Sequence, residues 1–562
     1  MNLHAVYHRT DSEMCFPVSE DTVVVRLRTA KGDFPSVSLV WMDTYRSMRG
    51  DLTEYSLVMK RIASDELFDH YEAELSPVNN GVVYYFRLSD DLFYGGYSFS
   101  CAKPSREEQF FLCCMVSPAD IFSVPSWARD AVIYQIFPDR FHPGTDVLSE
   151  SWNGPVTRAT KLGGTLRGIT GKLDYLADLG INCLYMTPIF LSPSNHKYDT
   201  VDYFTIDPEF GTKGDLIELV NEAHRRGMRV ILDAVFNHIS SESPQFRDVT
   251  ENGELSVYRN WFFVKKFPIE VKEFPDYATY GYHGNMPKLN TSNPEAREHL
   301  ISSAEYWMHE AGIDGWRIDV AGEIDREFWR EFRRRVKRVN PESLIVAELW
   351  GDASSWLLGD QFDTVMNYPL RAAVKGFLCE GLSARDFFDP LAMLRTGYRR
   401  APWSILWNLV GSHDTPRILT LAKGDRPRAR IAALIQMTLP GAPFIYYGDE
   451  LAMEGGRDPD CRRGMAWESG DFTMRTYFKA LIAARKKHAV LRYGQIAEIS
   501  APKGVLAYRL LYGDQEAVVI ANVSDDPFEC GIGGRWLDPV SGSLADGLSP
   551  VNQGEGFVFV RM

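Results

Sequence analysis

Two charged residues, Arg317 and Asp319, lie in an otherwise apolar run that has the pattern of a buried strand. Side chains two residues apart on a strand point to the same face, so this guanidinium and this carboxyl face one way while Trp316 and Ile318 face the other. Buried ionised groups need a partner. The pair therefore serves either as a structural ion pair or, at the C-terminal end of a barrel strand, as catalytic machinery.

Further polar clusters follow other strand-like runs. One is the segment 233–238, another is Glu348, and a third is the pair His413 and Asp414. Each cluster alone also fits a structural role, such as a helix cap, a solvated strand end or a hydrogen-bonded loop pair. Four clusters at the corresponding ends of four strands are better explained by one shared site.

The residue types in these clusters favour cleavage of a glycosidic bond. That reaction needs an ionised carboxylate and a protonated carboxylic acid on either side of the bond, and no metal-ligand spacing accompanies the carboxylates. Arg317 favours the ionised form of Asp319, as a nucleophile requires, whereas Glu348 at an apolar strand end can keep its proton. Asp414 would then bind substrate hydroxyls and support the transition state.

Strands that alternate with amphipathic helices must position these groups, and this pattern begins near Trp127. We count eight strand candidates, which predict a (β/α)8 TIM barrel. They are residues 131–136, 181–186, 229–235, the strand that holds Arg317 and Asp319, 344–348, 362–366, 405–410 and 443–447.

The chain is predicted to be multidomain, with a β-sandwich on each side of the barrel. Residues 1–122 form the N-terminal β-sandwich, in which 22–29 and 37–41 are expected to pair as a hairpin. The catalytic barrel takes residues 123–486, and a long insertion at about 238–293 is expected to form a subdomain over the barrel mouth. Residues 487–562 form the C-terminal β-sandwich.

The composition is that of an ordinary globular protein: 562 residues, 45% hydrophobic and 24% charged. The net charge of −14 argues against nucleic acid or an anionic membrane as a partner. We expect no signal peptide and no membrane span, and reduced cysteines, because the N-terminus lacks a basic start with an apolar run and the cysteines are scattered. These features predict a cytoplasmic protein.

The four polar segments together resemble the conserved regions of the α-amylase family of glycoside hydrolases. The matching segments are 233–238, 315–323, 345–350 and 410–414. The resemblance implies that Asp319 is the nucleophile, Glu348 the acid/base and Asp414 the transition-state stabiliser. It implies a substrate-binding role for Arg317, His238, His413, Tyr198, Asp233, Asn237 and Trp350.

The string Met286-Pro287-Lys288-Leu289-Asn290 resembles a motif of the neopullulanase, cyclomaltodextrinase and maltogenic amylase branch of that family. The branch carries an extra N-terminal β-domain, so the resemblance extends over essentially the whole chain. It implies that Asp458 and Arg462 help to bind a neighbouring glucose. It also implies a homodimer in which the N-terminal domain lies over the partner's barrel.

Many members of the branch have an Asn-Gly-Asp-rich calcium loop after the first barrel strand, whereas residues 141–146 contain few oxygen ligands. Because a hard cation needs six or more oxygens, we expect no metal and no other cofactor here. The predicted activity is retaining hydrolysis of α-1,4-glucosidic bonds in cyclodextrins and short maltodextrins, with pullulan and starch secondary. A transglycosylase on the same scaffold and a non-catalytic carbohydrate-binding protein are the alternatives.

Overall fold

The computed structural model describes the chain except residues 52, 77–80, 114–116, 146–147, 149–150, 272 and 549. It divides into two compact units. One contains residues 1–124, 352–359 and 385–403, and the other contains residues 125–351, 360–384 and 404–562.

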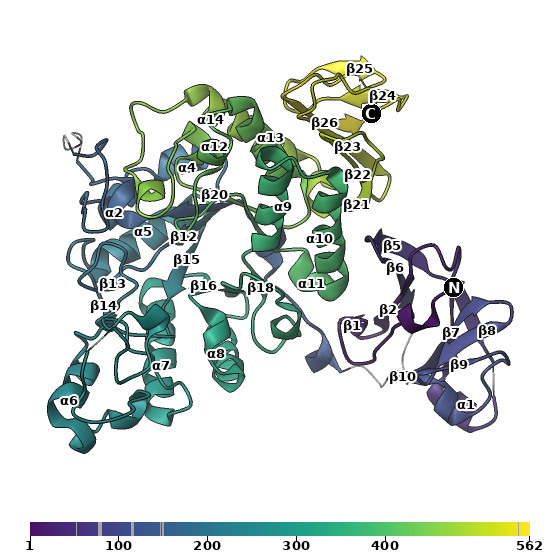
Figure 1. The fold of residues 1–562 in the computed structure, drawn as a ribbon, viewed down its shortest axis with the longest axis horizontal. Helices are drawn as coiled ribbons and strands as arrows, with labels where there is room; N and C mark the ends of the chain where they lie inside the picture. Colours follow the sequence, from purple (N-terminus) through teal and green to yellow (C-terminus); the bar gives the residue numbers. More distant parts are fainter. Residues whose placement is uncertain are drawn as a thin grey trace. The chain divides into compact units, whose positions relative to one another are not determined.

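The larger unit is built on eight parallel strands, and all eight predicted strands are confirmed (Figure 1). An isolated parallel bridge between Met366 and Trp407 joins the two ends of the sheet into a barrel. The order along the sheet is β18 (Thr364–Val365), β17 (Leu344–Ala347), β16 (Gly315–Ile318), β15 (Arg229–Ala234), β12 (Cys183–Met186), β11 (Ile133–Ile136), β20 (Ala442–Tyr446) and β19 (Trp407–Leu409).

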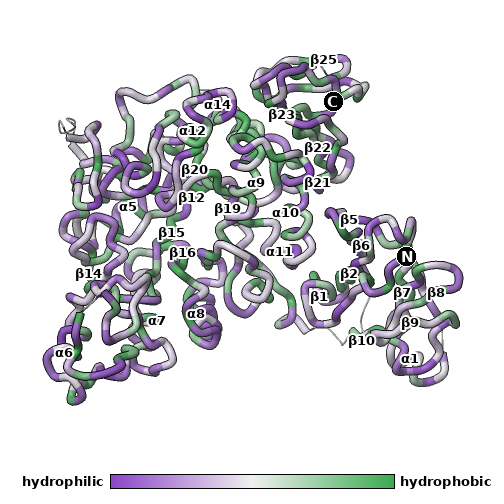
Figure 2. The backbone as a smooth tube through the Cα atoms, viewed as in Figure 1, coloured by the Kyte–Doolittle hydropathy of each residue, from purple (hydrophilic) through white to green (hydrophobic). Residues whose placement is uncertain are grey.

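The barrel strands are short, apolar and almost entirely buried, as expected for parallel strands covered on both faces. In Figure 2 the hydrophobic colour accordingly runs along β12, β15, β19 and β20. Polar side chains interrupt this pattern where the strands end, because a side chain at a C-terminal strand end reaches the barrel mouth without crossing the core.

Two helices of the unit have characteristic capping residues at one end. The Asn293 side chain accepts hydrogen bonds from two backbone N–H groups at the start of α7, and Pro294 is its first residue. Gly227, with φ of 73°, follows α5. The principal helices of the unit are α3 (Leu166–Thr170), α4 (Leu173–Leu179), α5 (Lys213–Arg225), α7 (Pro294–Ala311), α8 (Arg326–Val339), α9 (Tyr368–Cys379), α12 (Ile418–Leu421), α13 (Arg426–Thr438), α14 (Phe472–Lys487) and α15 (Val490–Tyr493).

The insertion after β15 carries α6 (Pro244–Asn252) and several short 3-10 turns. Its end returns to the barrel, because Lys288 forms a β-bridge with His238 and Leu289 forms one with Phe262. The segment 286–290 is therefore attached to the residues that directly follow β15. A two-stranded ribbon of β13 (Phe190–Leu191) and β14 (Asp202–Ile206) precedes the insertion.

The C-terminal part of this unit is a separate antiparallel sheet with its own apolar core. Six strands take part, in the order β21 (Gln495–Glu498), β22 (Val505–Tyr512), β23 (Gln515–Asn522), β26 (Glu555–Arg561), β24 (Arg535–Leu537) and β25 (Leu544–Asp546). A C-terminal β-sandwich is expected; a C-terminal β-domain is present, and its described strands belong to one sheet.

The smaller unit contains two antiparallel sheets that share one apolar core. The first has the order β1 (Cys15–Ser19), β2 (Thr22–Ala30), β6 (Phe68–Leu75) and β5 (Lys60–Ser64). The second contains β4 (Tyr55–Val58), β3 (Ser38–Asp43), β7 (Val82–Ser89), β8 (Leu92–Gly95) and β9 (Ser98–Ser100), with β10 (Phe111–Cys113) paired to β7. The segment 385–403, which contains most of α10 (Ala384–Gly397) and all of α11 (Arg400–Trp403), belongs to this unit.

The predicted hairpin between 22–29 and 37–41 is wrong. Strand β2 pairs with β1 and β6, while β3 pairs with β4 and β7 in the other sheet. The connection instead crosses the sandwich, because Phe34 and Val37 are buried in the core between the sheets. Alternation along a strand shows which face is buried but not which strand lies beside it.

No helix in the described parts of the chain is long and apolar enough to cross a membrane.

Candidate functional site

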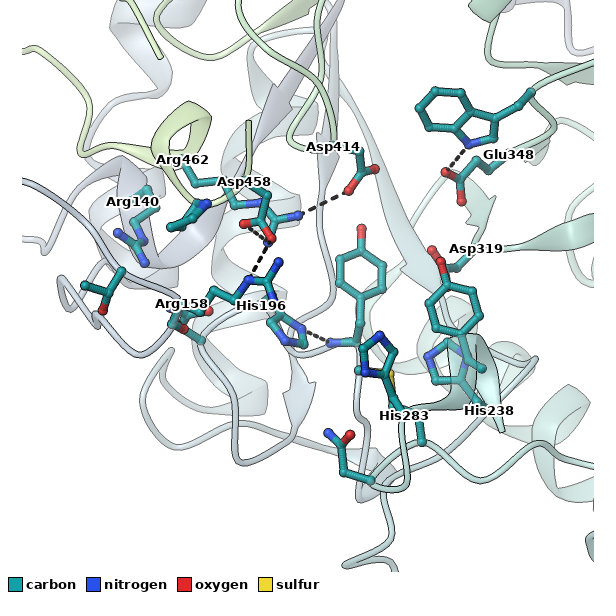
Figure 3. Close-up of a pocket in the computed structure, with 18 residues that line it drawn as sticks. Arg140, Arg158, His196, His238, His283, Asp319, Glu348, Asp414, Asp458 and Arg462 are labelled. Atoms are coloured by element: carbon teal, nitrogen blue, oxygen red, sulfur yellow. Dashed lines mark hydrogen bonds and ion pairs between the residues drawn. The ribbon is translucent and has the colours of Figure 1, made fainter. Parts of the chain in front are cut away.

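A cavity of about 510 Å³ opens where the barrel strands end. Eight of the predicted site residues line it: Tyr198, His238, Asp319, Glu348, Trp350, Asp414, Asp458 and Arg462. In Figure 3, Asp319 and Glu348 lie together on one side of the cavity, with Asp414 facing them. We call these three carboxylates the carboxylate end.

Arg317 holds two members of the carboxylate end, Asp319 and Glu348, and its side chain is 0% exposed. Its Nη1 lies 2.9 Å from Oδ1 of Asp319 and 3.0 Å from Oδ1 of Asp233, and its Nη2 lies 2.9 Å from Oε2 of Glu348. One guanidinium fork therefore holds three carboxylates from three adjacent strands. This contact between Arg317 and Asp319 is the one that the spacing on the strand predicts.

The carboxyl of Glu348 is surrounded by donors, so the predicted apolar environment is wrong. Besides Arg317, the backbone N–H of Val320 donates to Oε2 at 3.1 Å and the indole N–H of Trp350 donates to Oε1 at 3.0 Å. The turn after β16 aims the Val320 N–H at Glu348, which the strand pattern alone does not reveal. Trp350 is in turn stacked on Tyr368, with ring centroids 3.8 Å apart.

Burial raises the pKa of Asp319 well above its ordinary value, and the neighbouring Glu348 carboxylate raises it further. Arg317 opposes both effects but is the smaller influence. Arg317 favours the ionised form of Asp319, as expected, but burial and Glu348 together outweigh it.

Asp414 is held from two sides. Its Oδ2 lies 3.1 Å from Nε2 of His413, and its Oδ1 lies 3.2 Å from Nη2 of Arg462. The amide nitrogen of Gln135 lies 2.6 Å from Nδ1 of His413, so Nδ1 is the acceptor and Nε2 carries the proton. Burial keeps the pKa of His413 well below its ordinary value, so this ring is neutral.

Tyr198 lies in the cavity wall, where its hydroxyl contacts Asp233 and His413. Its hydroxyl donates to Oδ2 of Asp233 at 2.9 Å and lies 2.7 Å from Nε2 of His413, and its ring is parallel to that of His413. Tyr185 donates to the same Asp233 oxygen at 2.6 Å. Burial raises the pKa of Asp233 to about 6, although Arg317 and both tyrosines favour its ionised form.

His238 and Tyr280 form a second aromatic wall, with ring centroids 4.9 Å apart and nearly parallel planes. Burial lowers the pKa of His238 to about 3, so its ring is neutral under ordinary conditions. A neutral imidazole can donate a hydrogen bond to a sugar hydroxyl without a charge to desolvate.

Four predicted substrate-binding residues lie behind the cavity wall and do not line it: Arg317, His413, Asp233 and Asn237. All four are buried and contact neighbouring residues, and their predicted role in substrate binding stays a prediction. Arg317 and Asp233 hold the carboxylates, His413 holds Asp414, and Asn237 accepts from Lys288 at 2.5 Å.

The opposite end of the cavity is formed by the short helix α2 (Pro138–Phe141), the 3-10 turn Asp460–Arg462 and loops. We call its three arginines, Arg140, Arg158 and Arg462, the arginine end. Asp458 bridges two of them, at 3.0 Å from Nη1 of Arg462 and 3.5 Å from Nε of Arg158. Figure 3 shows these residues beside His196, away from Glu348.

Sequence reasoning missed several lining residues, because they come from loops and the insertion and carry no strand periodicity. They are Arg140, Thr157, Arg158, Asn195, His196, Tyr280, His283, Asn285, Met286 and Pro459. For three of them the sequence did contain a signal. His196 is close to Tyr198 in the chain, Asn285 directly precedes the 286–290 string, and Met286 is the first residue of that string.

In the described part of the loop after β11, several oxygens already have protein partners. The Thr165 hydroxyl donates to the Pro143 carbonyl at 3.1 Å, and the Asp139 carboxylate accepts from two backbone N–H groups and pairs with Arg140 at 2.7 Å. These oxygens are occupied, and a guanidinium beside Asp139 repels a cation. Asp146 of this loop lies outside the described residues.

Two family models match the chain. The model described as alpha amylase, catalytic domain, matches residues 135–489, and the alpha amylase N-terminal ig-like domain matches residues 1–117. Together they span the barrel and the N-terminal sheets.

Individual proteins are similar over nearly the full length. A cyclomaltodextrinase of Geobacillus thermopakistaniensis (strain MAS1) is 42% identical over 555 residues, covering 96% of this chain and 94% of that protein. Neopullulanase 2 of Thermoactinomyces vulgaris is 41% identical, covering 97% and 96%. A solved structure of a cyclomaltodextrinase superposes with a TM-score of 0.91 at 38% identity and covers both chains completely.

Proposed function

Because this chain belongs to the α-amylase family of glycoside hydrolases, we propose that it is a retaining hydrolase of α-1,4-glucosidic bonds. Its substrates are cyclodextrins and short maltodextrins, with pullulan and starch as further substrates, in line with relatives named cyclomaltodextrinase, neopullulanase and maltogenic alpha-amylase. The observation that carries the mechanism is the single guanidinium of Arg317, which contacts both Asp319 and Glu348.

The spacing of these carboxyls supports double displacement. Retaining glycosidases hold their two carboxyls at roughly 5 Å, with no room for a water molecule beside the sugar, whereas inverting enzymes need a wider gap. Two carboxyls that each lie 2.9 Å from adjacent nitrogens of one guanidinium suit the short spacing. We therefore assign Asp319 as the nucleophile and Glu348 as the acid/base.

The first step breaks the bond between the anomeric carbon and the leaving oxygen. Asp319 forms an ester with the anomeric carbon, and the leaving oxygen takes a proton from Glu348. Glu348 then removes a proton from water, whose oxygen displaces Asp319 and restores the carboxylate. Asp414, fixed by His413 and Arg462, binds the hydroxyls of the distorted sugar.

The anomeric configuration of the first product tests this assignment. Digestion of a maltodextrin followed by rapid ¹H NMR should show the α-anomer before mutarotation. Initial release of the β-anomer would contradict the role of Asp319 and require an inverting arrangement.

Transfer to a sugar instead of water is the second activity that the site supports. Trp350, 54% exposed and stacked on Tyr368, lies beside Glu348 where an acceptor sugar can stack. Added glucose should yield new oligosaccharides from β-cyclodextrin, and Trp350→Ala should reduce transfer more than hydrolysis. An equal reduction of both activities would argue against an acceptor platform.

We also propose a homodimer, supported by apolar side chains exposed on the insertion. Leu255, Val257, Val271, Phe274 and Tyr282 are each at least 61% exposed. Light scattering should give twice the chain mass, and the double variant Val271→Ser, Phe274→Ser should give a monomer. A wild-type monomer would refute the assembly.

A cytoplasmic location and activity without calcium complete the proposal. A relative named intracellular maltogenic amylase, from Bacillus subtilis, is 40% identical over 509 residues and supports the location. The occupied donors around Thr165 and Asp139 support the absence of calcium.

A further inference from the structure

The segment 286–290 contributes a charged side chain that does not line the cavity, Lys288. Its ammonium donates to Oδ1 of Asn237 at 2.5 Å, to the carbonyl of Glu323 at 3.0 Å and to the Glu323 carboxylate at 3.1 Å. The amide of Asn237 completes the cluster by donating to the same carboxylate at 3.2 Å. Lys288 thus ties the insertion to the end of β15 and to the turn after β16.

That turn has an unusual backbone. Val320 adopts φ of 45° and ψ of 43°, a left-handed conformation that is strained for a β-branched residue. The N–H of Glu323 donates to the carbonyl of Val320 at 3.1 Å and closes the turn. Such strain persists only where surrounding contacts fix the backbone, and Lys288 supplies two contacts to Glu323.

The strained conformation has a direct result at the acid/base. With φ positive at Val320, the peptide between Asp319 and Val320 points its N–H at Oε2 of Glu348, at 3.1 Å. If Val320 relaxed to negative φ, this peptide would rotate and the hydrogen bond would be lost. Glu348 would then keep Arg317 and Trp350 but lose the donor that fixes its plane relative to Asp319.

We propose that Lys288 is a positioning residue for Glu348, acting through Glu323 and the left-handed turn at Val320. This inference rests on the proposed acid/base role of Glu348. The insertion therefore contributes to proton transfer as well as to the shape of the cavity mouth.

The test compares a poor leaving group with a good one. Maltotriose needs the proton of Glu348 to release its product, whereas p-nitrophenyl α-maltoside needs little help. Lys288→Met should lower kcat/KM for maltotriose about tenfold, mainly through kcat, but lower that for the nitrophenyl substrate less than twofold. Lys288→Arg, which keeps the cation, should recover at least half of the lost activity.

Two controls test whether the effect of Lys288 on Glu348 passes through the turn at Val320. Lys213 forms a comparable ion pair with Glu310 at 2.9 Å on the outer helices, so Lys213→Met should change neither value. Glycine adopts positive φ without strain, so in a Val320→Gly background the Lys288→Met change should cost less than threefold on maltotriose. If Lys288→Met does not fold, judged by circular dichroism, Lys288→Gln replaces it.

An equal loss on both substrates, a loss confined to KM, or the same cost of Lys288→Met with and without the Val320→Gly substitution would overturn the proposal. The variant Glu348→Gln distinguishes failure of this proposal from failure of the proposed function. If that variant shows no preference for the good leaving group, then the acid/base assignment itself is wrong.

Discussion

The two ends of the cavity are built in opposite ways. The carboxylate end projects from strand ends, and the charges of Asp319 and Glu348 are buried around Arg317, which is 0% exposed. The arginine end comes from a short helix, a 3-10 turn and a loop, and although Arg140 there is buried, the side chain of Arg158 on the loop is 79% exposed. Buried charges interact strongly and hold a fixed geometry, whereas exposed charges are screened by water.

This contrast indicates that bond cleavage depends on the carboxylate end, whereas binding of further glucose units depends on the arginine end. Bond cleavage needs atoms held to fractions of an ångström, which strand ends packed in a barrel provide. Recognition of further glucose units tolerates mobile partners and uses loops. Substitutions should therefore cost most in turnover at the carboxylate end and least at the exposed part of the arginine end.

The largest effect is expected at the nucleophile. Asp319→Asn should lower kcat on β-cyclodextrin by on the order of 10⁴-fold, because an amide cannot form the glycosyl ester. Calorimetry should still detect binding of the cyclodextrin to a folded protein. Residual turnover within tenfold of wild type would mean that another group attacks the sugar.

The next effect concerns the guanidinium fork. Arg317→Lys keeps a positive charge but cannot bond to Asp319 and Glu348 in one plane, so kcat should fall by about 10²-fold. The melting temperature should fall as well, because buried carboxylates lose hydrogen bonds. A variant with normal kcat would show that the fork is structural only.

A smaller effect is expected where the two ends meet. Arg462 contacts both Asp414 and Asp458, so Arg462→Met should lower kcat/KM on maltotriose by about tenfold. Steady-state kinetics should divide this loss between kcat, through Asp414, and KM, through Asp458. A loss in KM alone would show that Asp414 needs no support from Arg462.

Arg158 is an exposed arginine that contacts Asp458, as the less exposed Arg462 also does, so the two can be compared. Its contact with Asp458 is 3.5 Å long and solvent-exposed, so Arg158→Ala should change kcat/KM less than about twofold. Should the loss equal that of Arg462→Met, burial would not be what separates the two ends.

The smallest effect is expected from chelation. The loop after β11 is closed by the Thr165 and Asp139 contacts, so treatment with EDTA should leave kcat and melting temperature unchanged. Differential scanning fluorimetry with and without added calcium checks this. A loss of stability that calcium restores would show that the loop binds a cation after all.

The sequence by itself determined the barrel and the position of the catalytic groups along it. Hydrophobic runs of strand length predict all eight parallel strands, because buried strands cannot accommodate polar residues except at their ends. The spacing of Arg317 and Asp319 predicts their contact, because strand side chains alternate. Local geometry of this kind depends only on neighbouring residues.

Tertiary structure alone decided the rest. Three features depend on segments far apart in the chain. The strands of the predicted hairpin lie in different sheets, Asp233 and Asn237 are buried behind the cavity wall, and donors surround Glu348. The shifted pKa of Asp319 likewise arises from burial and from Glu348, which lies on the next strand. Periodicity specifies which face of an element is buried, but the partner that covers it follows from packing of the whole chain.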